Sequence, residues 1–142
     1  MKTKLNGIGT AVLFLAMLIA ANTSFARDAF DGSSNLTCAT FEVVGCLEAD
    51  ECTSGQARKF DLPEFMTLDF KKKTIHVTYE SGEMEADSPI SNHQKSGTQL
   101  ILQGIEEGVG WSMSIHRDTG RMSIASVGHE LTFMLFGACK VD

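Results

Sequence analysis

The sequence predicts an all-β protein, a small antiparallel up-and-down barrel of about eight strands held by two disulfides. The first observation is the segment 98–139, where four apolar stretches follow one another and are separated by short turns that contain glycine. The second is a pair of alternating segments, 65–70 and 74–80, which flank three consecutive lysines and are typical of a hairpin. The third is the even number of cysteines, four, in a chain that begins with a predicted export signal.

The first 26 residues have the features of a cleaved secretory signal peptide. Two lysines supply a positive start, residues 11–21 form an apolar run, and Ser24 and Ala26 are the small residues that precede a cleavage site. A membrane anchor is the alternative, but a bilayer-spanning helix needs about 20 apolar residues. We therefore expect residues 1–26 to be removed and residues 27–142 to form a single domain without membrane insertion.

The mature chain is expected to be strongly acidic. Removal of the signal leaves 116 of the 142 residues and changes the formal net charge from −6 to −8, because two lysines and no acidic residue are lost. Nucleic acid and anionic membranes would repel such a surface, so neither is expected as a partner. A cationic partner would be attracted, although the same charge also keeps an exported protein soluble. The alanine-rich signal is typical of bacteria, and we expect a monomer in the periplasm, with secretion from the cell as the alternative.

All four cysteines lie in the mature part, and an oxidising compartment favours two disulfides, for which three pairings are possible. We predict Cys46–Cys52, which closes a short acidic loop. We also predict Cys38–Cys139, which joins the first strand to the last if these strands are neighbours in a closed meander. By chain-entropy arguments the longer loop gives the larger stabilisation, on the order of 4–5 kcal/mol. A zinc site is the alternative, but the usual close CxxC spacing is absent.

The other elements follow from local pattern. Pro63 excludes a central strand around it, and the polar residues 83–87 predict an edge strand. The last strand, 131–136, is apolar on both faces, so we expect it to be covered on both sides or to pair centrally. The expected order is a loose arm at 27–35, a strand at 36–44, a stapled loop at 46–58, a helical turn within 60–64, the hairpin of 65–70 and 74–80, the edge strand at 83–87, a loop at 91–97 and the four strands of 98–139.

The acidic residues give no strong signal for a metal or a catalytic site. Glu83, Glu85 and Asp87 would share one face of a strand and could hold calcium, but a charged edge strand explains them better. Glu106 and Glu107 are adjacent on a turn, where their side chains diverge. We interpret them as turn residues rather than as a glycosidase pair.

The histidines are scattered and predict no helical metal motif. His76 and His116 both face away from the presumed core and could meet if their strands were adjacent; the others are His93 and His129. No GxSxG elbow is present. We therefore expect no catalytic residue, no cofactor and no metal.

Trp111, the single tryptophan, shares a strand face with Met113 and Ile115. A core anchor is the simplest interpretation, and the floor of a ligand pocket in the barrel mouth is the alternative. Barrels of about eight strands either fill their interior with side chains or hold one small ligand. For a domain of this size we expect a filled interior.

Several segments of the mature chain resemble a group of small exported bacterial proteins of uncharacterised function. The likeness covers most of the mature chain, and the group supplies no activity. The segments that carry it are 69–75, 100–104, 110–112, 119–122 and 136–139.

A looser similarity exists to the periplasmic inhibitors of C-type lysozyme. Those are small β-barrels with an early cysteine bonded to one near the C-terminus, which would correspond here to Cys38 and Cys139. Their inhibitory motif is a segment with serine and glycine, which 79–82 and 95–97 resemble in composition. An acidic surface would suit a cationic lysozyme. The candidate binding residues are Trp111, Tyr79, Ser81 and Lys95.

The sequence therefore predicts a non-catalytic, exported binding module that recognises a protein or envelope component, in the manner of a lysozyme inhibitor or otherwise. The alternative is a carrier of a small apolar ligand inside the barrel. A hydrolytic enzyme is the third possibility.

Overall fold

The computed structural model describes residues 28–47, 51–79 and 85–142, and it confirms the all-β prediction. It contains ten strands, more than the predicted eight, and one short 3-10 helix. None of the described helical segments is long and apolar enough to cross a membrane. The elements are β1 (Leu36–Leu47), β2 (Thr53–Gly55), η1 (Ala57–Phe60), β3 (Phe65–Asp69), β4 (Thr74–Thr78), β5 (Glu85–Pro89), β6 (Asn92–Ser96), β7 (Gln99–Glu106), β8 (Val109–His116), β9 (Arg121–Val127) and β10 (Leu131–Val141).

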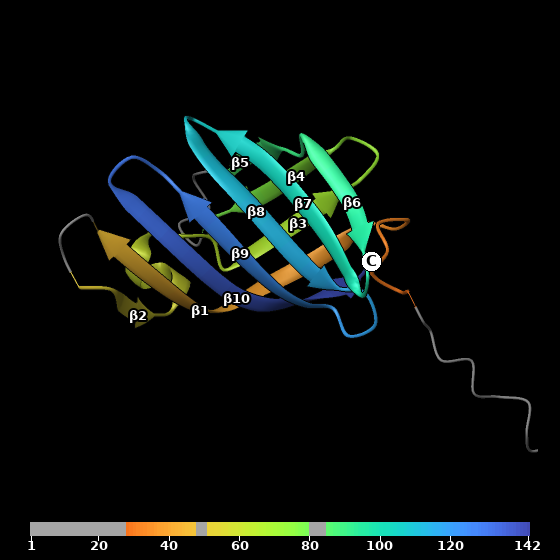
Figure 1. Cartoon of the computed structure of the whole chain (residues 1–142), viewed down its shortest axis with the longest axis horizontal. Helices are drawn as coiled ribbons and strands as arrows, with labels where there is room; N and C mark the ends of the chain where they lie inside the picture. The colour runs from red at the N-terminus through yellow and green to blue at the C-terminus, as the bar shows by residue number, and fades with distance from the viewer. Residues whose placement is uncertain (1–27, 48–50, 80–84) are drawn as a thin grey trace, which may run out of the picture.

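The strands form one antiparallel sheet in the order β5-β4-β3-β1-β10-β9-β8-β7-β6, with β2 paired to β1. The first long strand lies beside the last, as the meander predicted. The sheet curls into a half-barrel, and Figure 1 shows β3, β4 and β5 crossing behind the curved layer of β7 to β10. The predicted closed barrel is therefore wrong in one respect, because β5 and β6 form the two ends of the sheet and do not pair.

The sheet opens between β5 and β6 because the chain changes layers there. Pro89 ends β5 and has no amide hydrogen to extend a ladder. The Ile90 amide donates to the Lys73 carbonyl beside β4, and the Ser91 amide donates to the Gln103 carbonyl of β7. Consecutive amides thus bond to opposite layers, and β5 and β6 separate within two residues.

The core lies between the two layers. Inward residues alternate along β3, β7 and β8, as the sequence pattern predicted, and several are completely buried. We call β7 to β10 the front layer and β3 to β5 the back layer. The front layer contributes Leu100, Leu102, Met113 and Ile115, and the back layer contributes Met66, Leu68 and Ile75.

β10 pairs on both sides, with β1 and β9, which confirms the predicted central position. Its outer face is not covered, however. Met134 and Phe136 are 46% and 40% exposed, while Leu135 between them is buried. Central pairing satisfies the backbone of a strand, and it leaves the outer side chains of a half-barrel in contact with solvent.

Both predicted disulfides are present, Cys38–Cys139 and Cys46–Cys52. Cys38 and Cys139 are direct partners in the register between β1 and β10. Cys46 lies near the end of β1, and Cys52 immediately precedes β2. The long disulfide therefore fixes the two chain ends of the domain to each other, and the short one fixes the return of the chain after β1.

Three local predictions were wrong. The expected loop at 91–97 contains the strand β6, whose residues are all exposed and so lack the alternation that marks a strand. The stapled loop at 46–58 includes β2 and the start of η1, and this helical turn begins before the expected range of 60–64.

The arm that was expected to be loose is anchored from Asp28 onward. Phe30 packs against the core, and Asp28 forms an ion pair with Arg117 at 2.8 Å. Asp31 forms an ion pair with Lys95 of β6 at 2.7 Å. Hydrogen bonds from Lys95 and Ser33 hold the pKa of Asp31 well below its usual range.

Candidate functional site

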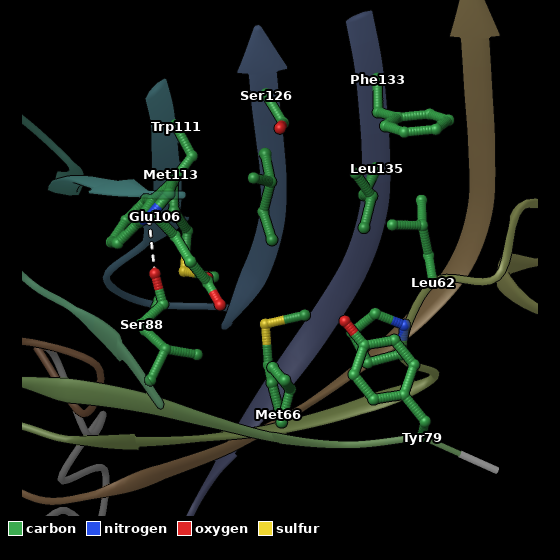
Figure 2. A pocket seen from close by; sticks show the side chains of 14 residues that line it. Leu62, Met66, Tyr79, Ser88, Glu106, Trp111, Met113, Ser126, Phe133 and Leu135 are labelled. Atoms are coloured by element: carbon green, nitrogen blue, oxygen red, sulfur yellow. Dashed lines mark hydrogen bonds between the residues drawn. The ribbon is translucent and has the colours of Figure 1, made fainter. Parts of the chain in front are cut away.

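A pocket lies between the two layers at the end where β4 finishes and β8 begins, and we call it the interlayer pocket (Figure 2). Its volume is about 150 Å³, and most of its wall is apolar. The apolar wall comes from five strands and the segment after η1, which approach one another because the sheet is curled. Its apolar members include Leu62, Met66, Val77, Met113, Ile124, Phe133 and Leu135.

The pocket continues outward into a wider chamber of about 280 Å³, which we call the mouth. Both spaces share six lining residues, which are Leu62, Tyr79, Glu106, Trp111, Ser126 and Phe133. Towards the solvent the mouth reaches the turns at the ends of the β7–β8 and β9–β10 hairpins. The apolar interlayer pocket therefore opens to solvent through the mouth, and the polar residues at their junction are Tyr79, Glu106 and Ser126.

Trp111 forms one wall of the interlayer pocket and joins the two layers. Its indole Nε1 donates a hydrogen bond of 2.8 Å to the Oγ of Ser88 on β5, drawn as the dashed line in Figure 2. Its ring covers Gly104, its direct partner on β7, where a β-carbon would collide with the ring and with the Pro89 carbonyl. Trp111 thus packs against the core and also forms part of a pocket wall.

Tyr79 lies immediately after β4 and lines the interlayer pocket from the back layer. Burial raises the pKa of its phenol above the ordinary value of 10.0, and the negative charges of Glu106, Asp61 and Glu107 raise it further. The sequence predicted that Tyr79 faces inward with Ile75, and the structure brings it into one site with Trp111.

Glu106 is the functional residue that sequence reasoning missed. It was interpreted as a turn residue, but it is the last residue of β7 and follows Leu102 and Gly104 on the inward face. In Figure 2 its carboxylate points into the space that Tyr79 faces from the opposite layer. The alternation along β7 was the signal that could have found it, because every second residue from Leu100 points inward.

No cation of the described protein neutralises Glu106. Neither the interlayer pocket nor the mouth is lined by Lys, Arg or His. Among the described residues, no ion pair includes its carboxylate. The site therefore combines an apolar interior, one partly buried carboxylate and the Tyr79 hydroxyl.

Of the other two predicted binding residues, the structure describes Lys95 alone, and Lys95 does not join this site. Lys95 lies on the exposed edge strand β6, where it binds Asp31, and it lines neither cavity. Ser81 lies outside the described residues. Of the four candidates, the structure thus brings together Trp111 and Tyr79.

The candidate metal and histidine sites do not assemble within the described chain. His76 and His116 lie on β4 and β8, which are not neighbours in the sheet. Glu83 lies outside the described residues, while Glu85 and Asp87 lie on the edge strand β5. The residues that the structure describes contain no group of three or more side chains that could hold a metal ion.

A polar row crosses the outer face of the back layer. Thr67, His76 and Asp87 are partners in register on β3, β4 and β5, and Nδ1 of His76 lies 2.8 Å from Oδ1 of Asp87. A hydroxyl nucleophile needs a base within hydrogen-bond reach, and no such bond joins Thr67 to His76 in the described structure. The row has the residue types of a triad without the activating contact.

Two disulfides fit a protein of an oxidising compartment outside the cytoplasm. Comparison of the chain with protein-family models, with curated proteins and with solved structures finds no match. The similarity to lysozyme inhibitors therefore stays a prediction, and the geometry of the interlayer pocket carries the functional interpretation.

Proposed function

We propose that this protein is a non-catalytic, exported binding module that holds an apolar part of a protein or envelope partner in the interlayer pocket. The observation that carries the proposal is the apolar cavity between the layers, walled by Trp111 and Tyr79 and open to solvent through the mouth. Apolar pockets with a few convergent polar groups are the usual form of binding sites in proteins.

The volume of the interlayer pocket favours anchoring of a single group over storage of a whole ligand. About 150 Å³ is the size of a cavity that holds one benzene molecule, whereas complete small-molecule ligands occupy about 300–1,000 Å³. One side chain or one short apolar fragment fills the inner space. A partner that inserts such a group would rest its remaining surface on the mouth.

The compartment and the charge support the same proposal. The predicted signal and the two disulfides agree with export, and we place the protein in the periplasm, with secretion from the cell as the alternative. The acidic mature chain would attract a cationic partner. The resemblance to lysozyme inhibitors makes C-type lysozyme one specific partner to test.

A carrier of a small apolar ligand is the second candidate function. The observation that favours it is the continuity between the interlayer pocket and the mouth, which share six lining residues. A ligand longer than one ring could extend through both spaces. A carrier binds such a ligand without any partner protein, and this difference separates the two candidates.

The test uses the oxidised mature chain as bait on an envelope extract, with a pocket-filling variant beside it. S126F places a large ring in the interlayer pocket. S123F introduces the same ring three residues earlier on β9, and it is the matched control because Ser123 lines neither the pocket nor the mouth. Thermal melts of both variants establish that they are folded.

A partner that wild type and S123F retain and S126F loses would support the binding module. Retention by folded S126F at the wild-type level would overturn the proposed site. In the same series, a change in Trp111 fluorescence on addition of apolar small molecules alone, with no retained partner, would favour the carrier. Lysozyme activity that stays intact at equimolar protein would remove lysozyme as the partner.

A further inference from the structure

The interlayer pocket presents one negative charge to whatever enters it. Glu106 extends its carboxylate into the space between the layers, opposite Tyr79, while the rest of the deep wall is mostly apolar. Dehydration of a carboxylate on closure of a complex is strongly unfavourable unless a cation or hydrogen-bond donors replace the lost water. No basic side chain lines the pocket or its mouth, so the described protein supplies no cation at this place.

Further negative charge surrounds the entrance. Glu107 follows Glu106 and lines the mouth, and Asp61 lies close enough to act on the Tyr79 phenol together with both glutamates. The two carboxylates that line the mouth, Glu106 and Glu107, create a potential that attracts a cation and repels an anion. A neutral apolar group or an acidic group would displace water from the Glu106 carboxylate without replacing its hydrogen bonds.

We propose that the group which enters the interlayer pocket is a lysine or arginine side chain of a partner protein, with its cation at Glu106 and its aliphatic stem along the apolar wall. This inference rests on the proposed function and names the chemistry of its partner. Lysine and arginine side chains combine an apolar stem with a charged end, which is the pattern of this site. The charged end is held by a charge-assisted hydrogen bond to the carboxylate, with the Tyr79 hydroxyl as a neighbouring acceptor.

The volume of the interlayer pocket favours the side chain of a protein over a free cationic amphiphile as the bound group. The inner space of about 150 Å³ matches one short aliphatic stem and by itself is too small for the tail of a lipid or detergent. The wider mouth, about 280 Å³, gives room for the backbone from which such a side chain projects. The partner is therefore a protein that presents an exposed basic residue.

The test follows the fluorescence of Trp111, the only tryptophan, during titration with blocked tripeptides whose central residue is lysine, arginine or norleucine. Norleucine has the same aliphatic chain as lysine without the ammonium group. We expect the lysine and arginine peptides to bind wild type at least tenfold more tightly than the norleucine peptide. E106Q should weaken the binding of the two basic peptides on the order of tenfold. It should leave the binding of the norleucine peptide equal or tighter, because a neutral amide is less costly to dehydrate than a carboxylate.

E42Q is the matched control because it removes the same charge from an exposed residue of β1 that lines neither the interlayer pocket nor the mouth. We expect it to change the affinity for the basic peptides less than twofold. Equal losses in E106Q and E42Q would overturn the inference, since they would indicate general attraction to an acidic surface. Butylamine is titrated as well, and binding of butylamine without binding of either basic peptide would overturn the assignment to a protein.

The inference and the proposed function fail in different ways. Equal affinity for the lysine and norleucine peptides, with binding lost in S126F, would overturn the cationic partner and leave an apolar binding pocket. A second outcome leads to the same conclusion. It is that no peptide binds, while the envelope extract still yields a partner that wild type retains and S126F loses. Retention of that partner by folded S126F would instead overturn the proposed function.

Discussion

Trp111 on β8 donates its indole hydrogen to the hydroxyl of Ser88 on β5, and this bond joins the two layers where the half-barrel does not close by strand pairing. Ser88 is the one buried polar residue among those that the structure describes. The bond satisfies both groups away from water and positions the indole as a wall of the interlayer pocket. The opening of the sheet and the shape of the candidate site thus depend on the same contact.

Removal of this hydrogen bond should destabilise the fold. S88A leaves the Trp111 indole without its acceptor, and an unsatisfied buried donor costs about 1–3 kcal/mol. Urea unfolding followed by circular dichroism measures the loss. The control is S123A on β9, which we expect within about 0.5 kcal/mol of wild type. Equal stability of S88A and S123A would show that the bond contributes nothing to the joining of the layers.

Gly104 and Gly110 provide a matched pair of glycine substitutions on adjacent strands. A β-carbon at Gly104 meets the Trp111 ring and the Pro89 carbonyl, whereas one at Gly110 has nothing within 4 Å. We expect G104A to lower the free energy of unfolding by about 1–3 kcal/mol, because the chain must shift the indole. G110A should be neutral or slightly stabilising. Thermal denaturation compares them, and a stability of G104A equal to that of G110A would contradict the close packing of Trp111 on Gly104.

The two disulfides should differ in their effect on stability. Cys38 and Cys139 are separated by 101 residues and Cys46 and Cys52 by 6, so the first closes a far longer loop in the unfolded chain. By chain entropy, loss of the long disulfide costs about 4–5 kcal/mol and loss of the short one about 2 kcal/mol. Guanidinium unfolding of C38A/C139A and C46A/C52A measures both. A larger loss in C46A/C52A would contradict this order.

Ionisation of Tyr79 reports directly on the charge at the pocket. It is the only tyrosine, so the ultraviolet absorbance of tyrosinate follows this residue alone. Its pKa is raised above 10.0 by burial and then by Glu106, Asp61 and Glu107. We expect E106Q to lower the pKa of Tyr79 towards 10.0, because one nearby negative charge is lost. An unchanged titration in E106Q would show that the Glu106 carboxylate does not face the phenol.

The same shift has a consequence for stability at high pH. A raised pKa means that the neutral phenol is favoured in the folded state. Its contribution is therefore complete below the unfolded pKa of about 10 and is lost as the pH rises through the folded value. The phenylalanine of Y79F does not ionise, so the free energy of unfolding of this variant should fall less over this alkaline range than that of wild type.

Much of the fold was readable from local pattern. The alternation at 65–70 and 74–80 corresponds to β3 and β4, and the turns of 98–139 separate β7 to β10. A buried face enforces this alternation, since a shift by one residue would turn the whole apolar set towards water. β6 escaped detection for the same reason, because all its residues are exposed and its strand conformation comes from backbone bonds to β7.

The candidate site was only partly readable. Trp111 was chosen as an inward aromatic residue, and Tyr79 as part of a segment that resembles the motif of lysozyme inhibitors. They face one cavity because the back layer crosses behind the front layer. Glu106 was missed because a charged residue next to Glu107 and Gly108 is typical of a turn. Its inward direction depends on β7 extending through Glu106, where it pairs with Val109.

The sequence alone determined the all-β class, the hairpins and both disulfide pairings, because these depend on periodicity, turn residues and a neighbouring first and last strand. The tertiary structure decided where the sheet opens and where the pocket forms. Pro89 and the divided hydrogen bonds of Ile90 and Ser91 separate β5 from β6, and the bond from Trp111 to Ser88 joins the layers instead. Such relationships bring together residues far apart in the chain, and no local pattern of side chains specifies the curvature that makes them neighbours.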